Sequence, residues 1–184
     1  MKNIHVAVVG AGYWGRNIVR VFSELGSLFA VCDTNKEVLK GISSRYPGVK
    51  VFVSFDELLS TDEVQAVAIA TPAVTHYELT KRAILAGKDV FVEKPLSLTT
   101  REGQELVDLA KEKERILMVG HILRYHPAIT KLKELIDSGS LGKIRYIYSN
   151  RLNIGKLRVE ENILWSFAPH DISVILHLVG EEPE

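Results

Sequence analysis

The sequence has little of what marks a secreted, membrane-bound or nucleic-acid-binding protein. Its one cysteine, Cys32, cannot form an internal disulfide, which is typical of a reducing compartment. No apolar run approaches the roughly 18 residues of a membrane helix, and only Met1-Lys2-Asn3 precede the first strand-like segment, too short a leader for a signal peptide. The 23 basic residues balance the 23 acidic ones, so no net field attracts nucleic acid or an anionic membrane. We therefore expect a cytoplasmic protein with no nucleic-acid or membrane partner.

What is present is an alternation of short apolar runs and amphipathic segments. The 184 residues are 46% apolar and 25% charged, which excludes a disordered chain. Almost wholly apolar runs are typical of strands in a parallel sheet covered on both faces. Six such runs are present: Ile4–Val9, Leu28–Cys32, Val51–Val53, Val64–Ala70, Val90–Val92 and Ile116–Val119. After the first run, apolar residues at helical spacing predict a helix whose sheet-facing side is Trp14, Ile18, Val21, Phe22 and Leu25.

Four of the predicted helices have a capping-box pattern, S/T-x-x-E, at their start. In this pattern the two side chains each satisfy a backbone N–H of the other residue. The pairs are Thr34 and Glu37, Ser54 and Glu57, Thr75 and Glu78, and Thr99 and Glu102. Their regular placement before apolar-periodic segments predicts repeated βαβ units, and so an α/β fold with a doubly wound parallel sheet.

The pattern changes after about residue 120. His126-Pro127 opens a predicted helix, Lys143–Leu152 is predicted to be a longer strand, and a last helix is predicted over roughly His170–Val179. We place a boundary near residues 119–126, which predicts domains over residues 1–120 and 121–184. One strand and two helices are too few to form a sheet with a buried face, so we interpret the second domain as incomplete.

A glycine-rich motif joins the first predicted strand to the first predicted helix. Gly10-Ala11-Gly12-Tyr13-Trp14-Gly15 is G-x-G-x-x-G, in which glycines permit a tight turn, close approach of a pyrophosphate and close helix packing. Asp33 ends the second strand, where a carboxylate can accept hydrogen bonds from the adenosine ribose. This acid favours NAD over NADP, whose 2′-phosphate it would repel, although Lys36 nearby can soften the preference. The alternative is a glycine turn that binds no nucleotide.

Three further motifs follow the fourth, fifth and sixth apolar runs, at the sheet edge where ligands bind in α/β folds. They are Thr71-Pro72-Ala73-Val74-Thr75-His76, Glu93-Lys94-Pro95 and Gly120-His121-Ile122-Leu123-Arg124-Tyr125-His126-Pro127. With the glycine motif and Asp33, their order resembles the glucose-fructose oxidoreductase/inositol dehydrogenase (Gfo/Idh/MocA) family. The resemblance implies an NAD(P)-binding Rossmann domain followed by a dihydrodipicolinate-reductase-like α/β domain. The open sheet of that second domain would carry the substrate pocket and the contacts of a homo-oligomer.

The resemblance also implies two catalytic residues. Lys94 matches the lysine that lies between nicotinamide and substrate, where an ammonium can stabilise charge on the reacting oxygen. The peptide bond before Pro95 is often cis in this family. His170 matches the histidine of a D-x-x-x-H pair, but Ser166 stands where the family has aspartate. A serine can hold a substrate hydroxyl or a water, yet it does not stabilise an imidazolium as a carboxylate does.

Other candidate residues come from the same motifs. The resemblance places Thr71, Pro72 and His76 near the nicotinamide ribose. The other predicted cofactor contacts are Tyr13, Trp14, Glu93 and Lys94. His76 alone would more often be a surface residue at a helix N-terminus. Arg124 and Arg151 are candidate substrate contacts, because arginine suits bidentate contact with phosphate or carboxylate. The other candidate substrate contacts are Tyr125, Asn153, Ser166 and His170. Each arginine is equally well explained as surface charge. No metal is assigned, since His121, His126 and His177 lack ligand spacing.

These patterns predict an NAD-dependent oxidoreductase. It would transfer a hydride between nicotinamide and a secondary alcohol of a sugar, polyol or nucleotide sugar, and NADP is the less favoured cofactor. The alternative is an NAD(H)-binding sensor or scaffold that has lost turnover, which Ser166 and the early C-terminus favour.

Overall fold

The computed structural model describes residues 4–150 and 163–181, without the side chains of residues 163–166. The chain separates into two compact units, residues 1–120 and residues 121–184, which we describe one at a time.

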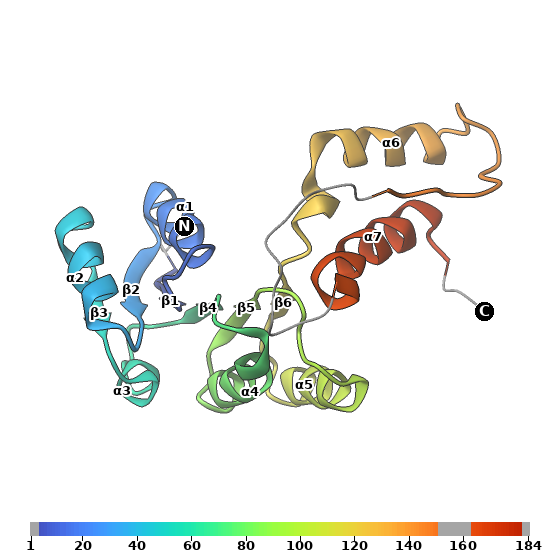
Figure 1. Cartoon of the computed structure of the whole chain (residues 1–184). Coiled ribbons are helices and arrows are strands. Elements are labelled where there is room, and N and C mark those ends of the chain that lie inside the picture. The colour runs from blue at the N-terminus through green and yellow to red at the C-terminus, as the bar shows by residue number, and fades with distance from the viewer. Residues whose placement is uncertain (1–3, 151–162, 182–184) are drawn as a thin grey trace. The chain divides into compact units, whose positions relative to one another are not determined.

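The first unit is built on a six-stranded parallel sheet with the order β3-β2-β1-β4-β5-β6 (Figure 1). The strands are β1 (Val6–Val9), β2 (Leu28–Cys32), β3 (Lys50–Phe52), β4 (Ala66–Ile69), β5 (Asp89–Val92) and β6 (Leu117–Val119). Each predicted apolar run overlaps one strand, so the predicted doubly wound parallel sheet is confirmed. The chain reverses its direction of winding between β1 and β4, and in such sheets ligands bind where the carboxyl ends of those two strands meet.

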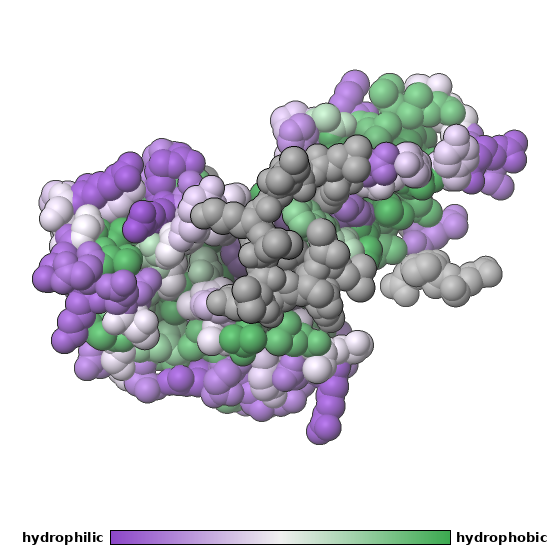
Figure 2. Space-filling model, in the orientation of Figure 1, coloured by the Kyte–Doolittle hydropathy of each residue, from purple (hydrophilic) through white to green (hydrophobic). Residues whose placement is uncertain are grey.

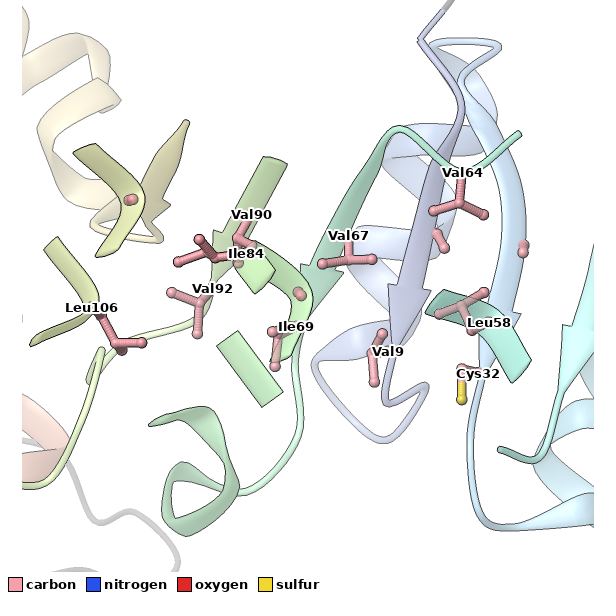
Figure 3. Close-up of a cluster of buried hydrophobic side chains, with 14 residues drawn as sticks. Val9, Cys32, Leu58, Val64, Val67, Ile69, Ile84, Val90, Val92 and Leu106 are labelled. Carbon is pink, nitrogen blue, oxygen red and sulfur yellow. The ribbon is translucent and has the colours of Figure 1, made fainter. Parts of the chain in front are cut away.

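Helices cover both faces of this sheet. They are α1 (Gly15–Glu24), α2 (Lys36–Arg45), α3 (Phe55–Leu59), the 3-10 turn η1 (Ala73–Thr75), α4 (His76–Leu85) and α5 (Thr100–Glu112). Leu58, Ile84 and Leu106, from α3, α4 and α5, pack against one face of the sheet (Figure 3). The opposite face is covered by α1 and α2. Because successive strand residues point to opposite faces, Val8 and Val9 belong to different clusters.

The buried side of α1 differs from the predicted one. Ile18 and Phe22 do pack against the sheet, together with the fully buried Val19. The prediction is wrong for Trp14, Val21 and Leu25, which are exposed. The reason is that α1 begins at Gly15, whose missing side chain brings this end of the helix against the turn. The residues that face the sheet therefore lie three, four and seven positions after Gly15, and they are Ile18, Val19 and Phe22.

Two of the four predicted capping boxes have the expected hydrogen bond. The hydroxyls of Ser54 and Thr99 accept from the backbone N–H groups three residues later. At α2 the cap is Asn35 instead of Thr34, because its Oδ1 accepts from the N–H groups of Glu37 and Val38. Thr75 makes no side-chain cap, since η1 precedes α4 and the Thr75 hydroxyl bonds back to the carbonyl of Pro72.

The second unit contains helices among its described residues. They are η2 (Ile122–Tyr125), α6 (Pro127–Asp137) and α7 (Ile163–Val179). The helix predicted to open at His126-Pro127 is confirmed, and the Nδ1 of His126 caps it by accepting from the N–H of Ala128 at 3.2 Å. None of the helices in the described ranges is long and apolar enough to cross a membrane.

Two predictions for this unit are wrong. Residues 143–150 form no strand, and residues 151 and 152 of the predicted strand lie outside the described residues. A strand needs a hydrogen-bonded partner, and none of the described residues of this unit supplies one. The last helix begins at Ile163 and not near His170, because Pro169 lies inside the helix. Proline is common in the first turn of a helix, so a pattern that contains Pro169 predicts a helix that begins there, six residues after the observed start.

Candidate functional site

The glycine motif forms the turn between β1 and α1. Gly10 has a φ of 85°, and a Cβ there would lie 2.8 Å from the carbonyl oxygen of Ala70. A Cβ at Gly15 would overlap the carbonyl oxygen of Gly10. The fold therefore requires both outer glycines. A Cβ at Gly12, by contrast, would meet no atom within 4 Å. The space beside Gly12 lies at the N-terminus of α1, where the helix dipole favours negative charge, and it fits the pyrophosphate of a dinucleotide.

Asp33 faces this turn from the end of β2. One carboxylate oxygen, Oδ2, accepts from the N–H of Ala11 at 2.8 Å, and the other, Oδ1, accepts from the N–H of Asn35 at 2.8 Å. These bonds fix the plane of the carboxylate and tie it to the glycine motif. Because each oxygen has a further lone pair, the group can also accept from ribose hydroxyls, which fits the predicted role.

The glycine motif is joined to the E-K-P motif through Trp14. The indole N–H of Trp14 donates to Oε1 of Glu93 at 2.7 Å, across 79 positions of sequence. Burial raises the pKa of the Glu93 carboxyl, while the bond from Trp14, the N–H of Lys94 and the positive charges of Lys94 and His76 act in the opposite direction. Tyr13, by contrast, is exposed.

Lys94 follows Glu93 at the carboxyl end of β5. Its side chain is half-buried, and the Lys94–Pro95 peptide bond is cis, as the family resemblance implies. The end of β6 packs closely here, since a Cβ at Gly120 would lie 3.2 Å from Oε1 of Glu93. Because β4 and β6 both pair with β5, Lys94 lies on a turn next to the carboxyl ends of these two strands.

The T-P loop after β4 carries His76, which is buried. Its ring nitrogens lie 2.6 Å from the carbonyl oxygen of Pro95 and 2.9 Å from that of Thr71. The alternative interpretation as a surface histidine is wrong, because the residue is 2% exposed. Contact of Thr71, Pro72 and His76 with a nicotinamide ribose stays a prediction. What the structure shows is a ring held between two loops.

The second unit carries the remaining candidates. His170 lies within α7 and is half-buried, and Asp171 beside it accepts a hydrogen bond from the Ser149 hydroxyl at 3.0 Å. Arg124 lies 3.4 Å from Nδ1 of His177, and Tyr125 is exposed. Arg151, Asn153 and the side chain of Ser166 lie outside the described residues. In the part of the chain that the structure describes, no three His, Cys, Asp or Glu side chains are grouped as metal ligands.

Sequence reasoning missed three features of the site. Neither the bond between Trp14 and Glu93, nor the bond between Asp33 and Ala11, nor the double contact of His76 follows from local sequence. Each joins residues that are distant in sequence or depends on how a side chain is turned. The sequence does indicate that the motifs lie near one another, because parallel strands bring their carboxyl ends to the same sheet edge.

Comparison with known proteins identifies the family. The model of the Gfo/Idh/MocA family, described as an oxidoreductase family with an NAD-binding Rossmann fold, matches residues 4–121. The chain belongs to this family. UDP-N-acetylglucosamine 3-dehydrogenase of Acidithiobacillus ferrooxidans is 33% identical, over 100% of this chain and 56% of that protein. The 2,7-anhydro-N-acetylneuraminate hydratase of Mediterraneibacter gnavus is 29% identical, over 100% of this chain and 51% of that protein.

A solved structure gives the same result for the fold. The crystal structure of an NAD-binding protein from Listeria innocua has a TM-score of 0.82 and 25% identity, and the match covers 95% of this chain and 54% of that one. The chain thus spans about half the length of the curated relatives it matches. The resemblance predicted from the motifs is confirmed at the level of the family and of the NAD-binding Rossmann fold.

Proposed function

We propose that this chain is part of an NAD-dependent oxidoreductase acting on a secondary alcohol of a sugar, polyol or nucleotide sugar. The observation that carries the proposal is the gathering of three elements at one sheet edge: the open cradle beside Gly12, the carboxylate of Asp33 turned toward it, and Lys94 on the neighbouring turn. The similarity to a dehydrogenase of a nucleotide sugar supports the substrate class.

Each of these residues has a separate task. Bound NAD supplies the hydride acceptor for alcohol oxidation. The turn around Gly12 holds the pyrophosphate, and Asp33 orients the adenosine ribose. Lys94 hydrogen-bonds the reacting oxygen and takes up or returns its proton as the alcohol becomes a carbonyl. The negative charge of Asp33 favours NAD, since a 2′-phosphate beside it would meet a like charge.

His170 is the second proposed proton-transfer group, and it belongs to the second unit. In this proposal Ser166 holds a substrate hydroxyl or a water, while Arg124, Tyr125, Arg151 and Asn153 contact the substrate. His170→Ala should then cost far more turnover than Ser166→Ala. Full turnover in a folded His170→Ala variant would remove His170 from the mechanism. We also propose that the full protein forms a homo-oligomer.

A single-turnover assay at 340 nm tests the proposal, using a panel of sugars, polyols and nucleotide sugars. We expect NADH to form with one member of the panel, and Lys94→Met to abolish most of that signal without weakening NAD binding. Lys111→Met, at an exposed position on α5, is the matched control and should behave like the unmutated protein. Full activity in a folded Lys94→Met variant would contradict the role of Lys94.

Two other outcomes identify other functions. NAD binding without turnover of any panel member, in a protein extended to the length of its relatives, would favour the sensor or scaffold. Conversion of substrate without net NADH, detected by mass spectrometry as addition of water, would favour a hydratase, and the similarity to a hydratase is the observation behind this second candidate.

A further inference from the structure

We propose that His76 is a positioning residue that fixes the turn carrying Lys94. Its ring forms a bridge between the T-P loop after β4 and the E-K-P turn after β5. The proposal gives His76 a role within the protein, in place of contact with the cofactor. Its kinetic part rests on the proposed function of Lys94, and its structural part does not.

The ring contacts are of one kind. Nδ1 lies 2.6 Å from the carbonyl oxygen of Pro95, and Nε2 lies 2.9 Å from that of Thr71. A carbonyl oxygen only accepts hydrogen bonds, so each contact is favourable when the facing nitrogen carries a hydrogen. Donation to both carbonyls requires the doubly protonated ring, because a neutral imidazole carries only one N–H. Because the ring is almost wholly buried, loss of either bond would leave a buried polar group unpaired. The free-energy cost of such a group is larger than the net contribution of a typical hydrogen bond to stability.

One side of this bridge is itself held in place. The hydroxyls of Thr71 and Thr75 are 2.7 Å apart, and the Thr75 hydroxyl donates to the carbonyl of Pro72 at 2.7 Å. The backbone N–H of Thr75 donates to the same carbonyl at 2.9 Å. The T-P loop is thus closed by its own bonds, and it gives His76 a fixed base.

The other side of the bridge ends next to Lys94. The bonded carbonyl belongs to Pro95, the residue directly after Lys94, so the contact with His76 holds the backbone one residue beyond Lys94. The N–H of Glu93 donates to the carbonyl of Ile69 at 2.9 Å, which fixes the residue before Lys94. His76 fixes the residue after it. Lys94 therefore lies between two anchored residues, and a catalytic amine held in this way keeps its geometry between turnovers.

The two bonds of His76 can be removed separately by substitution. The amide nitrogen of asparagine stands at the same number of bonds from Cα as Nδ1, so His76→Asn can keep the bond to Pro95 and lose the one to Thr71. The amide nitrogen of glutamine corresponds in the same way to Nε2, so His76→Gln can keep the bond to Thr71 and lose the one to Pro95. The two variants are matched controls for each other.

The ¹³C chemical shift of the Pro95 carbonyl gives a readout that does not depend on activity, because a carbonyl carbon is deshielded while its oxygen accepts a hydrogen bond. We expect this shift to be retained in His76→Asn and to move upfield in His76→Gln. With the substrate found at 340 nm, we expect kcat to follow the same order while the KM for NAD is unchanged. Equal Pro95 shifts in the two variants would overturn the proposal. If the shifts follow the predicted order but kcat does not, the bridge stands and the catalytic role of Lys94 fails.

A second test needs no variant. Long-range ¹H–¹⁵N spectra of the unmutated protein resolve the two ring nitrogens of each histidine. A hydrogen on both ring nitrogens of His76 supports the bridge. A ring that lacks a hydrogen on either nitrogen would contradict it, because that nitrogen could not then donate to its carbonyl oxygen.

Discussion

The two units of the chain differ in how far each buries its own apolar residues. Among the described residues, every buried hydrophobic side chain lies in residues 1–120, with the one exception of Leu178. In the second unit, large apolar side chains are exposed, including Leu141, Tyr146, Tyr148, Ile172 and Leu176. Figure 2 shows hydrophobic residues at the surface of this unit.

The difference shows which kind of fold a sequence pattern can specify. In the first unit each βαβ segment covers the sheet with its own helix, so an apolar period in the sequence corresponds to a buried face in the structure. In the second unit the apolar period is present, but the described helices α6 and α7 leave much of it exposed. We expect the first unit to carry most of the free energy of unfolding.

The largest expected effect is a truncation in the core of the first unit. Leu106→Ala removes a fully buried side chain and should lower the free energy of unfolding by about 2–5 kcal/mol. Leu176→Ala, at a leucine of α7 that is 40% exposed, should lower it by less than about 1 kcal/mol. Urea denaturation followed by circular dichroism measures both. Similar losses in the two variants would show that the second unit has a core of its own.

A smaller effect is expected at the glycine motif, where a second pair of substitutions separates folding from binding. Gly15→Ala places a Cβ against the carbonyl of Gly10 and should lower stability by about 1–3 kcal/mol. Gly12→Ala should leave the melting temperature nearly unchanged and weaken NADH binding at least tenfold. Thermal denaturation and calorimetric titration distinguish the two. Normal NADH binding by Gly12→Ala would place the pyrophosphate elsewhere.

The next effect is the pH dependence of stability at Glu93. Burial raises the pKa of its carboxyl above the ordinary value of 4.5, so the folded state holds the proton to higher pH than the unfolded state does. Stability from this group is therefore present below pH 4.5 and is lost as the pH rises through the folded-state pKa. Glu93→Gln keeps an acceptor for Trp14 and removes the titration. We expect the unmutated protein to lose stability relative to Glu93→Gln as the pH rises, and parallel curves would refute this.

The smallest expected effect is at Cys32. Burial, followed by the charges of Asp33 and Glu57, raises the pKa of this thiol to about 11. The thiol should therefore resist alkylation at pH 8 until the protein unfolds, as expected for a cysteine that serves as a small buried hydrophobe. Cys32→Ala should leave NADH binding unchanged. Rapid alkylation of the folded protein, measured by mass spectrometry, would contradict this.

The sequence predicts most of the first unit because its signals are local. β2 coincides with the predicted run Leu28–Cys32, and the caps at Ser54 and Thr99 follow from a three-residue spacing. The errors arise where another residue competes for the same role. Asn35 caps α2 in place of its neighbour Thr34, and η1 moves Thr75 out of a capping geometry.

The site is predicted less completely than the fold. Motifs identify Asp33, Lys94 and His76, but they do not show how the side chains are turned. The burial of His76 and the bond from Trp14 to Glu93 depend on the packing of loops that are far apart in sequence. In the second unit, Lys143–Leu152 has the composition of a strand, yet a strand forms only with a partner, and its own sequence carries no information about one.

We propose that the glycine turn and Asp33 form an NAD site within the first unit. Calorimetric titration of NADH and NADPH into the unmutated chain and into Asp33→Ala tests this proposal. We expect NADH to bind more tightly than NADPH, and Asp33→Ala to weaken NADH binding and narrow the difference between the two affinities. Equal or tighter binding of NADPH by the unmutated chain, or binding of neither nucleotide, would contradict it.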